Sequence, residues 1–164
     1  MPLTAAEVTA FVEAPKRVPA ESFRAIHWTT NGPDVARWLA PVEYAGTLPS
    51  RIVLIVNRSA ERHWNFQVDF HREAICAWHL RPGSNHKNYG CPRQFPSRVR
   101  EPHEHLWIEG VDWNCAMPLR GVGELSHEQA LGAFCRRMNI VLEPAYFPPP
   151  VGEQIILHPG ETRP

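Results

Sequence analysis

Two stretches of the chain carry apolar residues at helical spacing. Residues 5–14 begin after Thr4, which forms a capping-box pattern with Glu7. Residues 127–138 carry an apolar stripe at i, i+1, i+4, i+5 and i+8, behind a second capping box that starts at Ser126. The sequence therefore predicts two short amphipathic helices, one near each end of the chain.

The region between these helices has the pattern of β-strands. Residues 63–71 alternate between apolar and polar side chains, as a strand with one buried face does. Apolar runs of strand length, bounded by turn residues, predict further strands at 22–30, 51–57, 74–80, 103–109 and 113–119. Because the strands do not alternate with helices, the predicted fold class is α+β. We expect a mainly antiparallel sheet of five to six strands with two short helices packed on one face.

The remaining segments are predicted to be turns and loops. Residues 31–34 read as a turn that opens one helical turn through Trp38. The chain is predicted to form a single α+β domain over residues 1–143. Residues 144–164 are predicted to be a proline-rich tail without regular structure.

Composition narrows the class of protein. The 164 residues are 43% hydrophobic and include 17 basic and 17 acidic residues, so the formal net charge at pH 7 is zero. Such a chain is not a polybasic protein that binds polyanions over its whole surface. No apolar run approaches the roughly 18 residues of a membrane-spanning helix, and the N-terminus lacks the basic and apolar regions of a secretory signal. We therefore expect a soluble cytoplasmic protein with no membrane partner.

The four cysteines are expected to be free thiols. They lie at positions 76, 91, 115 and 135 and form no C-x-x-C pair, which argues against a structural zinc site with four thiolate ligands. Disulfides are rare in cytoplasmic chains. Cys76 and Cys135 lie within apolar patterns and are predicted to be small core residues.

The first candidate for chemistry is the strand that begins at His103. Side chains two apart share a face of a strand, so His103, His105 and Trp107 are predicted to lie together, and Glu109 follows at the same spacing. Two imidazoles presented in this way suit either a metal ion or an acid–base pair that works near neutral pH. The alternative interpretation is a pair of surface histidines on an open sheet face.

The second candidate is the long connection at 81–100, which holds five positive charges and no acidic residue. Long connections inside compact domains are often functional. Lysine and arginine suit contacts with phosphate, and an exposed aromatic ring suits stacking on a base. The predicted substrate- or phosphate-binding residues are Arg81, Lys87, Tyr89, Arg93, Arg98 and Trp107. The alternative is a solvated, arginine-rich loop.

The third candidate is the polar face of the strand at 63–71. If His79 on the neighbouring strand shares a face with Asp69 and His71, the carboxylate could orient an imidazole. A hydrated outer sheet face is the alternative interpretation. Strand order, which the sequence does not give, decides whether these side chains meet.

The chain also shows a resemblance, in an H-x-H-x-aromatic-x-E-G…W pattern. His86-Lys87-Asn88, the segment 103–110 and Trp113, followed by a helix that ends within 134–140, resemble a group of small uncharacterised bacterial proteins of mobile-element or prophage type. The resemblance covers about residues 50–142. It implies an accessory genetic context and no established activity.

The leading hypothesis from the sequence is a small nucleic-acid-acting protein of toxin type, a metal-independent ribonuclease without a cofactor. Its predicted catalytic residues are His86, His103 and His105, beside a basic loop that would hold RNA or another single-stranded nucleic acid. The sequence lacks a glycine-rich phosphate loop, a nucleophile elbow and an H-E-x-x-H motif. One alternative is a non-enzymatic binding module that regulates a protein or nucleic-acid partner. The other is a mononuclear metal hydrolase that uses the H-x-H strand.

Overall fold

The computed structural model describes residues 2–20, 29–30, 35–57, 62–111, 115–143, 145–146 and 148–149. Most of the strand predicted at 22–30, and the turn at 31–34, lie outside these ranges, as does the tail from residue 150 onward. The division of the chain at residue 143 stays a prediction. The elements are α1 (Ala5–Glu13), β1 (Lys16–Val18), β2 (Thr29–Thr30), β3 (Val35–Tyr44), β4 (Thr47–Asn57), β5 (Trp64–Phe70), β6 (Glu73–His79), β7 (His86–Lys87), β8 (Arg98–Val99), β9 (His103–Leu106), β10 (Ala116–Pro118), α3 (His127–Arg137) and β11 (Ile140–Leu142).

The α+β class and the mainly antiparallel sheet are confirmed. Within the described ranges the main sheet has nine strands, eight of them in the order β10-β9-β6-β5-β4-β3-β1-β11, while β2 pairs with β3. Among the strand pairings of the described residues, only that of β1 with β11 is parallel. The predicted count of five to six strands is therefore too low. Strands of two or three residues, such as β1 and β11, carry too little periodicity to be recognised in a sequence.

The helical turn predicted through Trp38 is wrong, because this residue lies in the middle of β3. Burial alternates along the strand, with Ala36, Trp38, Ala40 and Val42 buried. Two of these inward residues are alanines, so the alternation is weak in the sequence although it is clear in the structure. Strand β4 pairs with β3 on one side and with β5 on the other, so it lies inside the sheet and not at an edge.

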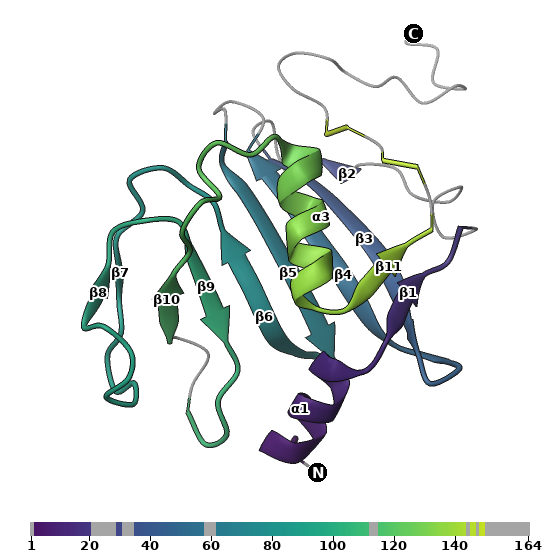
Figure 1. Ribbon diagram of the computed structural model, residues 1–164, viewed down its shortest axis with the longest axis horizontal. Helices are drawn as coiled ribbons and strands as arrows, with labels where there is room; N and C mark the ends of the chain where they lie inside the picture. The colour runs from purple at the N-terminus through teal and green to yellow at the C-terminus, as the bar shows by residue number, and fades with distance from the viewer. Residues whose placement is uncertain are drawn as a thin grey trace, which may run out of the picture.

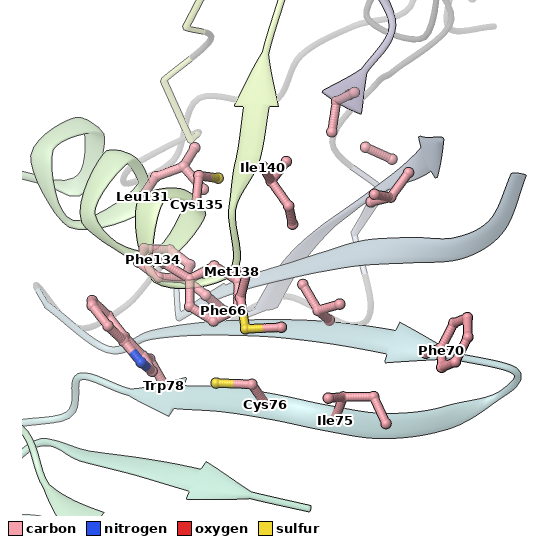
Figure 2. Close-up of a cluster of buried hydrophobic side chains, with 14 of the residues drawn as sticks. Phe66, Phe70, Ile75, Cys76, Trp78, Leu131, Phe134, Cys135, Met138 and Ile140 are labelled. Atoms are coloured by element: carbon pink, nitrogen blue, oxygen red, sulfur yellow. The ribbon is translucent and has the colours of Figure 1, made fainter. Parts of the chain in front are cut away.

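Both predicted helices are confirmed, and both capping boxes form at Thr4 and Ser126. The helices cover the same face of the sheet, which Figure 1 shows most clearly for α3. Phe11 of α1 stacks on Phe70 with ring centroids 4.1 Å apart, and Phe134 of α3 packs 5.6 Å from Phe66. Since Phe66 and Phe70 point to the same side of β5, the hydrophobic core lies on this side (Figure 2).

The opposite face of the sheet follows from the β5–β6 hairpin. His71 and Arg72 form its turn with positive φ values of 48° and 72°, as a tight two-residue turn requires. The register then pairs Phe66 with Trp78 on the core side. The next pair along, Asn65 with His79, must point away from the core.

The two helices in the described part of the chain have nine and eleven residues. Neither is long and apolar enough to cross a membrane.

Candidate metal centre

Strand pairing brings three histidines together on the sheet face that the helices leave uncovered. Strand β9 pairs with β6 so that His103 lies opposite His79, and His105 lies opposite Ala77. Leu106 and Glu104 alternate with the histidines and point to the core side, opposite Cys76 and Trp78. The predicted alternation along the H-x-H strand is therefore confirmed for both histidines, and β6 adds a third imidazole to them.

The long connection between β6 and β9 supplies a fourth imidazole. It forms the two-stranded hairpin β7–β8, in which His86 pairs with Val99. The His86 ring centroid lies 4.6 Å from that of His105 and 5.3 Å from that of His103. The three histidines predicted to be catalytic, His86, His103 and His105, are thus brought together.

The spacing of these rings matches that of a metal site. One nitrogen from each of His79, His103 and His105 lies within 4.8 Å of the others. Five ring pairs among the four histidines have centroids 4.6–5.3 Å apart. Four imidazoles around zinc, with Zn–N distances of about 2.0–2.1 Å, place their ring centroids about 5 Å apart. The four-histidine cluster, His79, His86, His103 and His105, therefore contains three imidazoles whose nitrogens are spaced as ligands of one ion are, with the His86 ring packed beside them.

Burial favours the neutral form of the strand histidines. His103 and His105 are 3% and 4% exposed. Desolvation, together with the other imidazoles nearby, lowers the pKa of His105 to about 3 and that of His79 to about 4. The pKa of His103 is also lowered, first by desolvation. Neutral imidazoles keep a nitrogen lone pair, which is the form that binds a metal ion.

The tautomer of His103 is set by its surroundings. Its Nδ1 lies 3.0 Å from the carbonyl oxygen of Glu101, and a carbonyl oxygen can only accept, so Nδ1–H is the donor. Ser84 Oγ donates to the same carbonyl at 2.7 Å and lies 3.3 Å from Nδ1. The lone pair of His103 is therefore on Nε2, which is buried and has no hydrogen-bond partner among the described residues. Histidine ligands of metals are commonly oriented by such a bond from the second ring nitrogen.

The expectation of four free thiols is wrong for two of the cysteines. Cys91 of the long connection and Cys115, which precedes β10, form a disulfide. The sequence does not predict this disulfide, because the two cysteines are far apart in the chain and have no C-x-x-C spacing. They come together because the connection packs beside β10. Cys76 and Cys135 are buried free thiols, as predicted.

Besides the disulfide, hydrogen bonds of Asn88 hold the same connection against the sheet. The Asn88 side chain donates to the carbonyl oxygen of Ala116 at 2.8 Å and accepts from the amide N–H of Ala116 at 2.7 Å. Ala116 is itself paired with His105. The disulfide and Asn88 together fix the hairpin that carries His86 beside the strand histidines.

Other predicted site residues lie elsewhere. Trp107 lies beyond the end of β9, packs against the core cluster and donates from Nε1 to Glu73 at 2.7 Å, so it is not beside the histidines. Glu109 accepts from the amide N–H of Ala5 at the start of α1. The strand at 103–109 is shorter than predicted, and its continued alternation was the reason for grouping these two side chains with the site.

The predicted patch around Asp69 does not form either. Asp69 is paired with Arg51 at 2.7 Å and accepts from Gln67 at 2.5 Å, so its carboxylate is held by these partners. His71 lies in the hairpin turn, and its ring lies tilted beside that of Phe70. Of this third candidate, only His79 joins the cluster.

Sequence reasoning also missed a buried carboxylate behind the histidines. Glu104 points to the core side, where it accepts from Trp78 Nε1 at 3.2 Å and forms an ion pair with Arg137 of α3 at 3.0 Å. The sequence contains a signal for it, because the alternation that turns His103 and His105 to one face of β9 must turn Glu104 to the core side. This network joins β9 to the helix.

Comparison of the chain with protein-family models, with curated proteins and with solved structures finds no match. The geometry of the four-histidine cluster is therefore the basis for a functional proposal.

Proposed function

We propose that this chain binds one transition-metal ion, preferably zinc, through His79, His103 and His105, and acts as a mononuclear metal-dependent hydrolase. The observation that carries this proposal is the convergence of three imidazoles, two of them buried, whose nitrogens lie within 4.8 Å of one another. Imidazole ligands suit zinc and neighbouring first-row metals, whereas calcium and magnesium prefer oxygen ligands. The oriented Nε2 of His103 supports the same assignment.

The number of ligands decides between a structural and a catalytic role. Structural zinc sites have four protein ligands, whereas catalytic sites keep three and leave a position for substrate or water. The three strand histidines are fixed by β6 and β9, while His86 lies on a separate hairpin. A zinc ion held by the strand ligands would supply Lewis-acid catalysis of hydrolysis. His86 then lies where it can contact either the ion or the substrate.

The experiment is metal analysis of protein prepared without a histidine tag. We expect about one equivalent of zinc per chain after reconstitution, and loss of this equivalent in His103→Ala/His105→Ala. The control is His71→Asn, which removes an exposed imidazole from a turn outside the cluster. Less than about a tenth of an equivalent in the folded wild-type protein, for zinc, iron, nickel and manganese alike, would contradict the proposal.

A metal-independent ribonuclease of toxin type is the second candidate. The closeness of His86 to His103 and His105, beside a basic loop, supports it. It ranks lower because RNA cleavage without a metal needs a protonated acid as well as a neutral base, and burial disfavours the protonated form of the strand histidines. Cleavage of RNA that persists in EDTA and is lost in His103→Ala/His105→Ala would favour this candidate over the metal hydrolase.

A binding module without catalytic activity is the third candidate. It would tolerate single histidine substitutions and lose partner affinity when several arginines of the basic loop are removed. The resemblance to mobile-element proteins stays a prediction.

A further inference from the structure

The basic hairpin has an outer face that points away from the histidines. In β7 and β8, His86 pairs with Val99, and Lys87 pairs with Arg98. Val99 is buried and His86 contacts the strand histidines, so this pair faces inward. Since side chains alternate along a strand, Lys87 and Arg98 face outward, and both are exposed. Lys87, which the sequence predicts to bind phosphate or substrate, therefore lies on the outer face of the hairpin.

The pairing of Lys87 with Arg98 is electrostatically unfavourable in the free protein. Like charges directly opposite each other on neighbouring strands destabilise the pair. No acidic residue occurs between positions 81 and 100 to relieve the repulsion. An anion bound across the two cations would remove it.

The cations of this connection differ from others in the molecule. Arg17, Arg51 and Arg137 each form an ion pair with a carboxylate. By contrast, all five cations of the connection are exposed, and within the described ranges none of them forms an ion pair; they are Arg81, Lys87, Arg93, Arg98 and Arg100. This local excess of positive charge lies on a chain whose formal net charge is zero. It therefore attracts anions to one place on the surface.

An aromatic ring lies within this charged surface. Tyr89 is 75% exposed, although large aromatic side chains are normally shielded from water. The Lys87 ammonium lies 5.5 Å from its ring centroid. A cation beside an exposed ring can bind the phosphate and the base of the same nucleotide, and an unpaired base offers its face for stacking. The bases of a duplex are already stacked on one another.

The surface is fixed in place before any ligand arrives. The Asn88 amide N–H donates to Ser97 across the hairpin, and the Asn88 side chain is bonded to Ala116. The disulfide between Cys91 and Cys115 ties the same segment to the sheet. A preordered surface loses less conformational entropy on binding.

We propose that the outer face of the β7–β8 hairpin, formed by Lys87, Arg98 and Tyr89, binds single-stranded nucleic acid through its phosphates and one unpaired base. The bound strand would be the substrate of the four-histidine cluster, which lies on the inner side of the same hairpin. This assignment rests on the proposed function. The binding itself does not depend on the metal.

The test is fluorescence anisotropy with labelled oligouridine RNA and oligothymidine DNA of about 15 nucleotides, with EDTA present to prevent metal-dependent cleavage. We expect Lys87→Gln/Arg98→Gln to weaken binding at least about tenfold at low salt. The slope of log affinity against log salt should fall by about 1.4, because each phosphate contact on a single strand contributes about 0.7. The control is Arg72→Gln/Arg136→Gln, which removes two exposed charges elsewhere and should leave the affinity within about twofold of wild type.

Tyr89→Ala separates nucleic acid from other polyanions. It should weaken binding of the oligonucleotides by about fivefold or more, since stacking on one base is worth about 1–3 kcal/mol, and leave binding of heparin unchanged. Equal binding of oligonucleotides by the wild type and the Lys87→Gln/Arg98→Gln variant overturns the proposal. So does a Tyr89→Ala variant that binds oligonucleotides as wild type does, which would indicate an acidic protein or other polyanion as the partner.

The two proposals fail in different ways. One equivalent of metal without oligonucleotide binding refutes the nucleic-acid surface and leaves the metal centre. Oligonucleotide binding without metal uptake refutes the metal centre and leaves the surface.

Discussion

The disulfide between Cys91 and Cys115 gives a quantitative prediction for the stability of the site. The two cysteines are separated by 24 positions in the chain. The loop-entropy relation for a closed loop of this size gives about 3.4 kcal/mol of stabilisation at 25 °C, through restriction of the unfolded chain. Because a small domain has only about 5–15 kcal/mol of total stability, Cys91→Ser/Cys115→Ser should unfold at a markedly lower urea concentration.

The assay is urea unfolding followed by tryptophan fluorescence, on wild type and on the double variant, each with and without a phosphine reductant. Reduction should lower the free energy of unfolding of the wild type by about 2–4 kcal/mol. The double variant should start at that lower stability and not respond to the reductant, which is its internal control. Thiol titration of the unfolded protein should give two thiols for the oxidised wild type, from Cys76 and Cys135.

Two results would refute this reasoning. Four titratable thiols in protein purified without reductant would show that the disulfide does not form. A disulfide that forms but changes the unfolding free energy by less than about 1 kcal/mol would show that Asn88 and the hairpin already hold the connection in place. The bond would then have little effect on the position of His86.

Three further predictions concern buried polar groups. Lys16 donates from Nζ to backbone carbonyls at the end of α1, at 3.1 Å for Val12 and 2.7 Å for Ala14, so Lys16→Met should cost about 2 kcal/mol in urea unfolding. Glu104→Ala should cost about 2–3 kcal/mol by the same measurement, because the Nε1–H of Trp78 stays buried without its acceptor. Burial lowers the pKa of His127 to about 4, against about 6.5 in the unfolded chain, so the unfolded state binds the extra proton between these values and stability falls as pH falls. Urea unfolding curves should show that the free energy of unfolding falls between pH 7 and pH 4 in both proteins. The fall should be about 3 kcal/mol smaller for His127→Phe than for the wild type.

The sequence predicts those elements whose signals are local. The two helices are predicted by their capping boxes and apolar stripes, and β5 is predicted by its strict alternation of apolar and polar residues. The same alternation places His103 and His105 on one face and Glu104 on the other. These are consequences of bonds between near neighbours, so no tertiary information is needed.

The rest of the site depends on contacts between distant parts of the chain. His79 joins the cluster only because β6 pairs with β9 in a register that sets it opposite His103. His86 joins only because the connection folds back as a hairpin and is bonded through Asn88 to Ala116. A shift of either register by one residue would turn these imidazoles to the other side.

Metal binding should also stabilise the fold, and this can be measured apart from any activity. The four histidines come from two paired strands and a hairpin, so the unfolded chain does not hold them at ligand distance. A ligand that binds only the folded state adds about 2.7 kcal/mol of stability at a free concentration one hundred times its Kd. Zinc should therefore raise the melting temperature of the wild type and of His71→Asn, and leave that of His103→Ala/His105→Ala unchanged. An equal rise in the double variant would place the zinc elsewhere on the chain. No rise in the wild type, at zinc concentrations up to the millimolar range, would mean that the buried histidines serve the fold by packing alone.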